Sequence, residues 1–293
     1  MFAVRSIARP VSNAASATNV AMQTRNMATL KEIQLRLRSV QNIAKITKSM
    51  KMIASTKVAK AQRSMESARA FGQSGNELFD AAETKPVDDA NVIYITSSSD
   101  RGLCGGIHSS VAKHTRKLAN ENPSSSLIIL GDKAKAQLSR TNRNQIRLTF
   151  NQIGKDIPTY AEACAVADMI VKQNVEFDVA RVVYNQFKSV LSYEAQEIPL
   201  YSEETFKSSP NFAAYEIEDD VLSNLQEFTM ANAVYWGMVE GHAAEMASKR
   251  NAMESATKNA GEMIDKLTMT FNRRRQADIT NELVDIITGA SAL

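Results

Sequence analysis

The residues best suited to chemistry form a serine- and glycine-rich turn. The segment Ser97-Ser98-Ser99-Asp100-Arg101-Gly102-Leu103-Cys104-Gly105-Gly106 follows an apolar run and precedes a helix-like stretch. Free backbone amides at such a helix start can hold a phosphate. The turn lacks the Lys-Ser/Thr ending of a P-loop and the three-glycine spacing of a dinucleotide fingerprint. A tight structural turn is therefore the favoured interpretation, and a nucleotide site is the alternative.

The histidines and cysteines do not form a catalytic or metal-binding pattern in the sequence. His108, His114 and His242 have no ligand-like spacing, and His108 has no acidic neighbour in sequence to orient it. Cys104 and Cys164 are the only cysteines, and they match neither a metal motif nor a disulfide framework. The sequence thus predicts no catalytic residue, no metal site and no cofactor, and its cysteine usage is typical of a reducing compartment.

The net charge of the chain comes from its first residues. The sequence has 35 basic and 32 acidic residues, and residues 1–27 contain Arg5, Arg9 and Arg25 but no acid. This arginine- and serine-containing leader is typical of a mitochondrial presequence, with a mature start near Ala28; a disordered tail is the alternative. No run of about 18 apolar residues occurs, so we expect no segment that spans a membrane.

Residues 28–82 predict one long helix in a coiled coil. Residues that recur at steps of three and four positions are apolar or small, as along the seam of a coiled coil. This stripe consists of Ile33, Leu37, Val40, Ala44, Thr47, Ala54, Val58, Ala61, Met65 and Ala68. Between Ile33 and Met65 there are eight basic residues and no acid: Arg36, Arg38, Lys45, Lys48, Lys51, Lys57, Lys60 and Arg63. Because a one-sign stretch is self-repelling, we expect an acidic or phosphate-bearing partner, with a solvated face as the alternative.

The middle of the chain predicts a small α/β domain over residues 91–200, between linkers at 83–90 and 201–218. Short β-branched runs alternate with helix-like stretches, which favours a largely parallel sheet. The expected strands are Val92–Thr96, Leu127–Leu130, Ile146–Phe150, Val179–Tyr184 and Ser192–Pro199, and the expected helices are Ser109–Ala119, Lys133–Arg140 and Thr159–Asn174.

Residues 219–293 predict a second long helix, which pairs antiparallel with the first. Its three-four stripe contains Leu222, Leu225, Thr229, Asn232, Trp236, Val239, Ala243 and Met246. Close helix packing would explain Gly237, Gly241 and Gly261, each of which costs about 1 kcal/mol relative to Ala in an exposed helix. An apolar tip follows Arg273-Arg274-Arg275-Gln276 and should be covered by a partner or by a fold-back of the tail.

Four segments together resemble the gamma subunit of F-type, mitochondrial ATP synthase. The first two are Ala28-Thr29-Leu30-Lys31-Glu32-Ile33 and Lys45-Ile46-Thr47-Lys48-Ser49-Met50-Lys51-Met52. The third is Ser99 to Gly106, and the last and most specific is Arg275-Gln276-Ala277-Asp278-Ile279-Thr280-Asn281-Glu282-Leu283-Val284-Asp285-Ile286-Ile287-Thr288-Gly289-Ala290. The resemblance spans Ala28 to Leu293.

The resemblance implies a non-catalytic rotor shaft. In that family the terminal helices form an antiparallel coiled coil with a small Rossmann-like α/β domain inserted between them as a foot. Partners implied are the alpha and beta subunits of the catalytic head, the delta and epsilon stalk subunits and the membrane rotor ring, without nucleic acid. The chain would couple proton-driven ring rotation to ATP synthesis at the beta subunits, as a peripheral protein on the matrix side of the mitochondrial inner membrane.

The resemblance also assigns roles to residues of this chain. Those implied to contact the beta subunit are Arg275, Gln276, Lys48, Met50 and Lys51. Those implied to run in an apolar bearing are Leu283, Ile286, Ile287, Ala290 and Leu293. The foot loop would contain Arg101, Gly102, Leu103, Cys104, Gly105 and Gly106.

Two other functions remain open at the level of sequence. One is a matrix nucleotide-binding α/β protein that uses the Ser97–Gly106 turn. The other is a basic coiled-coil tether for nucleic acid or lipid, because stripes of Lys and Arg bind phosphates. The basic segment lacks the aromatic residues that would stack on bases.

Overall fold

The computed structural model describes residues 29–85, 91–173, 175, 177–215 and 219–291. These residues divide into two compact units: Leu37–Thr268 is one, and the other combines the described residues before Leu37 with those from Met269 onward. The elements are α1 (Leu30–Ala81), β1 (Val92–Ser97), α2 (Ile107–Glu121), β2 (Ser126–Leu130), α3 (Asp132–Leu138), η1 (Arg143–Gln145), β3 (Ile146–Phe150), α4 (Tyr160–Lys172), β4 (Val179–Phe187), β5 (Tyr193–Tyr201), α5 (Glu203–Lys207), η2 (Phe212–Ala214) and α6 (Asp219–Ser291).

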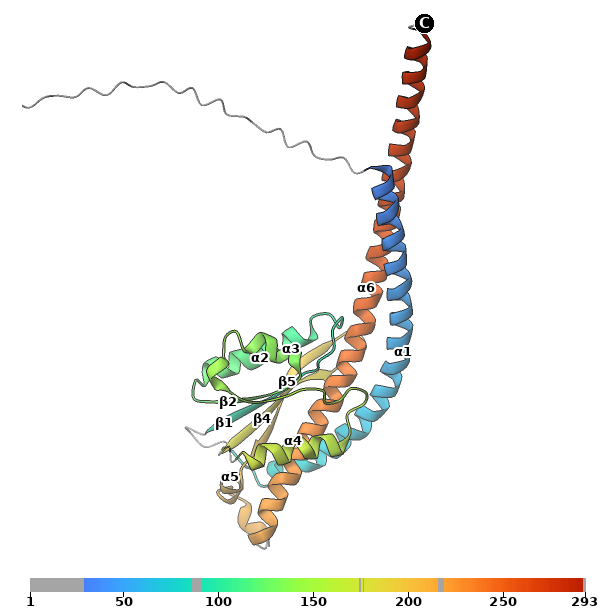
Figure 1. Cartoon of the computed structure of the whole chain (residues 1–293). Helices are drawn as coiled ribbons and strands as arrows, with labels where there is room; N and C mark the ends of the chain where they lie inside the picture. Colours follow the sequence, from blue (N-terminus) through green and yellow to red (C-terminus); the bar gives the residue numbers. More distant parts are fainter. Residues whose placement is uncertain (1–28, 86–90, 174, 176, 216–218, 292–293) are drawn as a thin grey trace, which may run out of the picture. The chain divides into compact units, whose positions relative to one another are not determined.

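The larger unit contains a five-stranded sheet of order β3-β2-β1-β4-β5 (Figure 1). The first four strands are parallel, and β5 pairs antiparallel with β4. The sequence therefore predicted all five strands and the largely parallel sheet correctly. Helices follow β1, β2 and β3, as the alternating pattern indicated.

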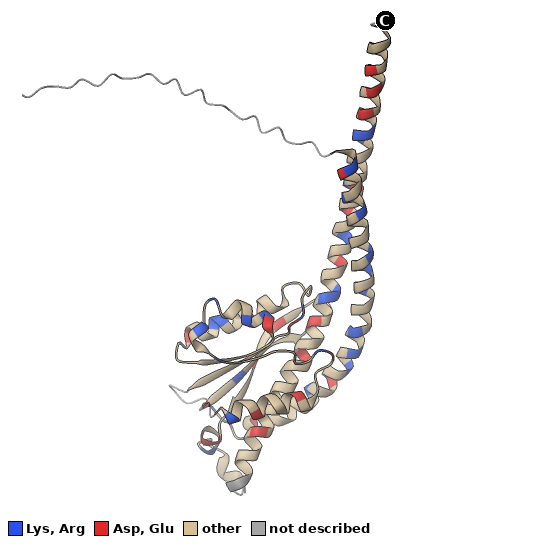
Figure 2. Cartoon of the chain, in the orientation of Figure 1, with Lys and Arg blue, Asp and Glu red and all other residues tan. Residues whose placement is uncertain are grey.

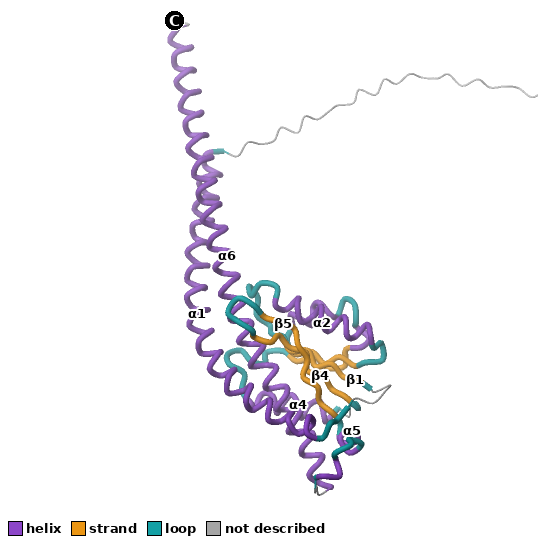
Figure 3. Tube along the Cα trace, turned by 180° about the vertical axis from the view of Figure 1, so that it is seen from behind, coloured by secondary structure: helices purple, strands orange, loops and turns teal. Residues whose placement is uncertain are grey.

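Alternating side chains on the strands give the sheet two buried faces. Tyr94 and Leu127 point toward α2, where they pack with Val111 and Leu118. Their neighbours on the same strands, such as Ile93 and Ile128, belong instead to the largest core cluster, which also includes side chains from α4, α6 and the end of α1. Helices thus cover both faces, which matches the near-continuous apolar strands (Figure 3).

In the larger unit, α1 and α6 pack along the stripes that the sequence predicted. Val58, Ala61 and Met65 of α1 are buried in one cluster with Val239 and Ala243 of α6. The helices approach closely at Gly72, where an added Cβ would lie 2.6 Å from the Trp236 ring. The prediction of a paired seam is confirmed for this unit.

The glycines of α6 do not all have the expected reason. A Cβ at Gly237 would lie 2.9 Å from Val182 of the sheet, so close packing does require a glycine there. A Cβ at Gly241 would make an ordinary 3.7 Å contact with Ser97, and one at Gly261 would meet nothing within 4 Å. The prediction of close helix packing was therefore wrong for all three glycines: Gly237 packs against a strand, and the other two positions are not tightly packed. Sequence spacing does not reveal what lies opposite each position.

The second expected linker is largely structured. Residues 201–218 contain the last residue of β5, helix α5 and the short helix η2. Phe206 of α5 is buried in the core and makes edge-to-face contacts with Phe79 and Phe212. The prediction of a plain linker is therefore corrected, because the aromatic side chains in this polar segment cap the end of the sheet domain.

Several predictions fall outside the described residues. They are the presequence at 1–27 with its cleavage near Ala28, most of the linker at 83–90, and Leu293. Among the residues that are described, no helix is long and apolar enough to cross a membrane.

Candidate functional site

Polar contacts along the seam join α1 to α6 in the larger unit. The Thr257 hydroxyl donates to Thr47 Oγ1 at 2.8 Å, and Lys51 Nζ donates to Glu254 Oε1 at 2.8 Å. This hydrogen bond from Lys51 lowers the pKa of Glu254. Lys51, which lies between Thr47 and Ala54 of the predicted stripe, therefore forms an ion pair between the two helices.

A buried carboxylate forms a further polar contact of the seam. The Glu240 side chain on α6 is fully buried, and its two oxygens accept hydrogen bonds from Arg69 Nη2 of α1 and from Trp236 Nε1 at 2.6 Å. Removing one partner of such a pair leaves an uncompensated buried charge, which is strongly destabilising. The pair fixes the register of the two helices near the sheet.

Few acids of the described chain pair with the eight cations of α1 between Ile33 and Met65. Figure 2 marks Lys and Arg in blue and Asp and Glu in red. Lys51 pairs with Glu254, and Lys57 lies 3.4 Å from Asp156 in the loop before α4. Across the described chain, the other six members of the basic set make no ion pair, and all six are exposed. The structure thus supplies two acids that the sequence could not reveal and leaves six cations for a partner or for solvent.

The residues implied to contact a beta subunit lie on both long helices. Lys48 is exposed on α1, and Met50 and Lys51 are half-buried. Arg275 and Gln276 are exposed on α6, in the smaller unit. Their neighbour Arg274 pairs with Asp278 at 3.2 Å.

The last part of α6 presents apolar side chains to solvent. Leu283 is 54% exposed, Ile286 70% and Ile287 58%, and Ala290 is exposed as well. Exposed apolar side chains that cluster at one end mark a contact surface more often than a solvated helix. The alternative of a tail that folds back to cover them does not hold for the described residues.

The turn after β1 is held by its own chain rather than shaped for a nucleotide. The Asp100 carboxylate accepts hydrogen bonds from the backbone amides of Asp132 at 2.7 Å and Gln152 at 2.6 Å. It therefore joins the loops that follow β1, β2 and β3. Gly131, with φ of 95°, allows this approach, because a Cβ there would lie 2.7 Å from the Ser99 nitrogen.

The cavity beside this turn is small. It has a volume of about 30 Å³ and is lined by Ser97–Ser99, His108, Gly241, His242 and Glu245 among others. A water molecule fits such a space, whereas a ligand pocket needs several hundred cubic ångströms. The described structure favours the interpretation of a tight structural turn.

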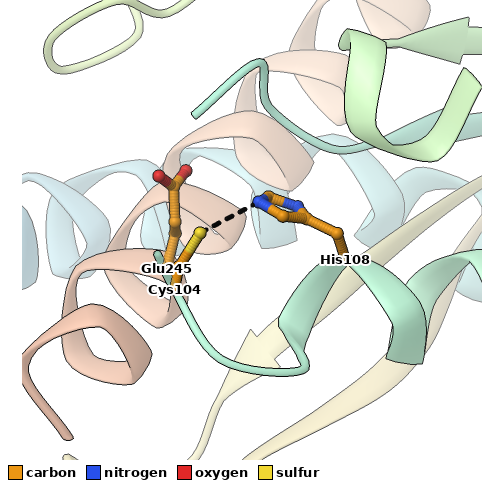
Figure 4. A group of neighbouring side chains, drawn as sticks. All are labelled: Cys104, His108 and Glu245. Carbon is orange, nitrogen blue, oxygen red and sulfur yellow. Dashed lines mark hydrogen bonds between the residues drawn. The ribbon is translucent and has the colours of Figure 1, made fainter. Parts of the chain in front are cut away.

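Cys104 and His108 of the foot-loop region converge with Glu245 of α6 (Figure 4). Cys104 Sγ lies 3.1 Å from His108 Nε2, and one ligand atom from each of the three residues lies within 4.8 Å of the others. Burial raises the pKa of the Cys104 thiol to about 11 and that of Glu245 above its usual range, and it lowers the pKa of His108. The rest of the foot loop is exposed or half-buried, with Leu103 64% exposed.

The other two histidines have separate surroundings. His114 lies 2.9 Å from Glu197, which also pairs with Arg181 at 2.9 Å. His242 is buried beside the small cavity, and this burial, with the nearby charges of Arg101 and Lys57, lowers its pKa to about 4.

Comparison with known proteins identifies the family. The family model described as ATP synthase matches residues 29–293. The mitochondrial ATP synthase subunit gamma of Yarrowia lipolytica is 45% identical over 298 residues and covers all of both chains. The rat ATP synthase F(1) complex subunit gamma is 44% identical and covers 91% of this chain and all of that protein.

The chain belongs to the gamma-subunit family of mitochondrial ATP synthases. A chain of the Euglena gracilis mitochondrial ATP synthase, OSCP/F1/c-ring structure has the same fold, with a TM-score of 0.77 and 21% identity over 90% of this chain and 94% of that one. A chain of the Tetrahymena thermophila central stalk/c-ring structure has a TM-score of 0.62 and 27% identity over 72% of this chain and 99% of that one.

Sequence reasoning on this gamma-family chain missed the cluster of Cys104, His108 and Glu245. The expectation that His108 lacks an acidic neighbour holds in sequence but not in space. Glu245 lies 137 residues after His108, and no spacing rule covers such a distance. The available signal was a glutamate next to the predicted apolar stripe of α6, because a carboxylate in a buried position needs a partner.

Proposed function

We propose that this gamma-family chain is the rotating, non-catalytic shaft that transmits torque to the catalytic head of ATP synthase. The observation that carries the proposal is the pairing of α1 and α6 through a continuous seam and the buried Arg69–Glu240 pair. Two helices fixed to one another resist bending and twisting better than a single helix. The sheet domain packed beside them would serve as the foot.

The proposed partners follow from the exposed surfaces. Six unpaired cations on α1 would face acidic loops of the beta subunits, with Lys48 and Met50 among the contact residues. The exposed apolar end at Leu283, Ile286 and Ile287 would run in an apolar sleeve formed by the alpha and beta subunits. The foot would contact the delta and epsilon subunits and the membrane ring, and the chain would then lie on the matrix side of the inner membrane.

The shaft would carry no active site of its own. In the turn after β1, the Asp100 carboxylate accepts hydrogen bonds from two backbone amides of the same chain. The adjoining cavity has room for a water molecule only. Nucleotide chemistry would then belong to the beta subunits. Rotation would change their affinity for nucleotide in turn.

The test is a charge reversal at Arg275, which with Gln276 would form a polar contact with a beta-subunit loop, called here the polar catch. Arg275→Glu replaces an exposed cation that would meet a beta-subunit loop, so we expect slower coupled ATP synthesis with normal assembly of the complex. Arg273→Glu is the matched control, because it makes the same charge change at another exposed position on the same helix. Arg274 is unsuitable because it pairs with Asp278.

ATP synthesis is measured in energised vesicles that contain the variant complexes, and assembly is measured from the amount of complex purified. Equal rates for Arg275→Glu and the native complex would contradict the catch. Equal slowing by both reversals would show a general effect of charge rather than a specific contact. Either result would remove Arg275 from the proposed site.

A further inference from the structure

We propose that Cys104, His108 and Glu245 form a zinc site that ties the turn after β1 to helix α6. The three side chains come from three elements, the turn, the start of α2 and the middle of α6, and they converge in the interior of the larger unit (Figure 4). This inference concerns the foot and does not depend on the proposed torque function.

The donor set and its spacing suit Zn²⁺. A thiolate, an imidazole and a carboxylate bind zinc at about 2.0–2.3 Å, which places tetrahedral ligand atoms roughly 3.3–3.6 Å apart. Cys104 Sγ and His108 Nε2 are 3.1 Å apart, and all three ligand atoms lie within 4.8 Å. Small side-chain rotations would therefore bring them onto one ion.

Hydrogen bonding alone leaves the cluster incompletely satisfied. Cys104 Sγ and His108 Nε2 both lie against the carbonyl oxygen of Arg101, at 3.5 Å and 3.0 Å. Glu245 is only 4% exposed, and its Oε1 has no hydrogen-bond partner among the described residues. A buried acceptor without a partner is costly. A cation bound here would satisfy the Glu245 carboxylate and would take the sulfur and the ring nitrogen, which already have hydrogen-bond partners, as its other ligands.

The surrounding hydrogen bonds fit a metal-bound histidine. His108 Nδ1 lies 3.1 Å from the Ser98 hydroxyl, so the ring can donate there while Nε2 faces the ion. Metal-binding histidines almost always use their second nitrogen in this way.

The charge balance also fits a divalent ion. Binding releases the thiol proton of Cys104 to solvent, and the resulting thiolate with the Glu245 carboxylate neutralises two positive charges. Lys133, Lys249 and Arg101 lie near enough to influence these groups, and Asp100 is a nearby anion, so the two anionic ligands are needed to offset the surplus of positive charge. The loss of either anion should therefore weaken binding strongly.

The site would act as a cross-link rather than as a catalyst. Its neighbouring cavity of about 30 Å³ borders His108 and Glu245 and could hold one water as the fourth ligand, but no substrate. The turn already contacts α6 through the hydrogen bond from Ser248 to the Cys104 carbonyl, at 2.6 Å. Zinc would add a further cross-link between the turn and α6.

The experiment measures zinc in purified ATP synthase that contains the native chain or single variants. Cells are grown with added zinc, the complex is desalted, and its metal content is determined by mass spectrometry. We expect the native complex to hold one zinc ion more than complexes with Cys104→Ser or Glu245→Gln. Cys164→Ser is the matched control, since it removes the other, half-buried cysteine and should leave the zinc content unchanged.

A second readout covers the case in which Cys104→Ser fails to assemble. The native complex is stripped with a chelator and loaded with Co²⁺, and we expect a thiolate-to-cobalt absorption in the near ultraviolet. Glu245→Gln should lower the affinity for Co²⁺ at least tenfold, and Cys164→Ser should not change it.

The proposal is overturned if the native complex holds no more zinc than Glu245→Gln, or if the cobalt-loaded native complex lacks the thiolate absorption. It is also overturned if Cys164→Ser removes the zinc or the absorption. None of these results bears on the Arg275 experiment, so the two proposals fail separately.

Discussion

Replacing Gly72 with alanine tests the close approach of α1 and α6. A Cβ at this position would lie 2.6–2.7 Å from three ring atoms of Trp236. The indole cannot shift freely, because its Nε1 donates to Glu240 at 2.6 Å and its ring rests against Tyr184 at a centroid distance of 6.1 Å. The substitution therefore forces either the ring or the helix backbone to move.

The magnitude follows from two opposing contributions. Overpacking a filled interface costs about 1–3 kcal/mol, and the rigid ring favours the upper half of that range. Replacing Gly with Ala inside a helix stabilises the helix by about 1 kcal/mol, because Ala has the higher helix propensity. Gly72→Ala should thus lower the free energy of unfolding by about 1–2 kcal/mol.

Gly261→Ala is the matched control for this variant. It makes the same exchange in α6, where nothing lies within 4 Å of the added Cβ, so it should stabilise the chain by about 1 kcal/mol. The propensity gain cancels between the two variants, and the difference of about 2–3 kcal/mol reports the contact with Trp236. Urea unfolding of the purified chain, followed by circular dichroism, measures both midpoints. Equal midpoints, or a higher one for Gly72→Ala, would refute the close packing.

Three further results are expected. Burial lowers the pKa of His242 to about 4, below the unfolded value near 6.5. Between these values the unfolded chain binds more protons than the folded chain, so the free energy of unfolding should fall as pH drops through this window. His242→Gln should flatten this dependence of the free energy of unfolding on pH, measured at pH 4 to 7. Asp100→Ala removes the acceptor of two loop amides, so both should exchange hydrogen faster, whereas amides of the distant α5 should not change. Ala61→Leu places a larger side chain at a seam position that is 1% exposed and should lower the free energy of unfolding by about 1–3 kcal/mol. The same change at exposed Ala59 should have little effect. Equal urea midpoints for the two variants would contradict the seam.

The long helices and the strands of this gamma subunit could be predicted because their signals are local. The three-four stripe from Val58 to Met65 and the β-branched run at Val92 depend only on residues close in sequence. The same patterns identified which side of each helix is buried. Element bounds agreed with the structure to within a few residues for this reason.

The features that could not be predicted depend on contacts between distant segments. The sequence shows eight cations and no acid between Ile33 and Met65, but Asp156 and Glu254 reach two of these cations from other elements. Glu245 meets Cys104 only because α6 packs against the sheet and reaches the turn after β1. The segment around Phe206 looked like a linker because its polar residues outnumber the aromatic ones that anchor it.

The most direct test of the shaft proposal is to observe rotation of this chain. Leu191, in the turn between β4 and β5, is 81% exposed, so Leu191→Cys offers an attachment point for a bead on the foot domain. The catalytic head that contains this chain is fixed to a surface and supplied with ATP. The proposal predicts rotation of the bead in one direction, at a rate that depends on the ATP concentration. A bead that stays fixed or only fluctuates, in heads that hydrolyse ATP normally, would contradict it.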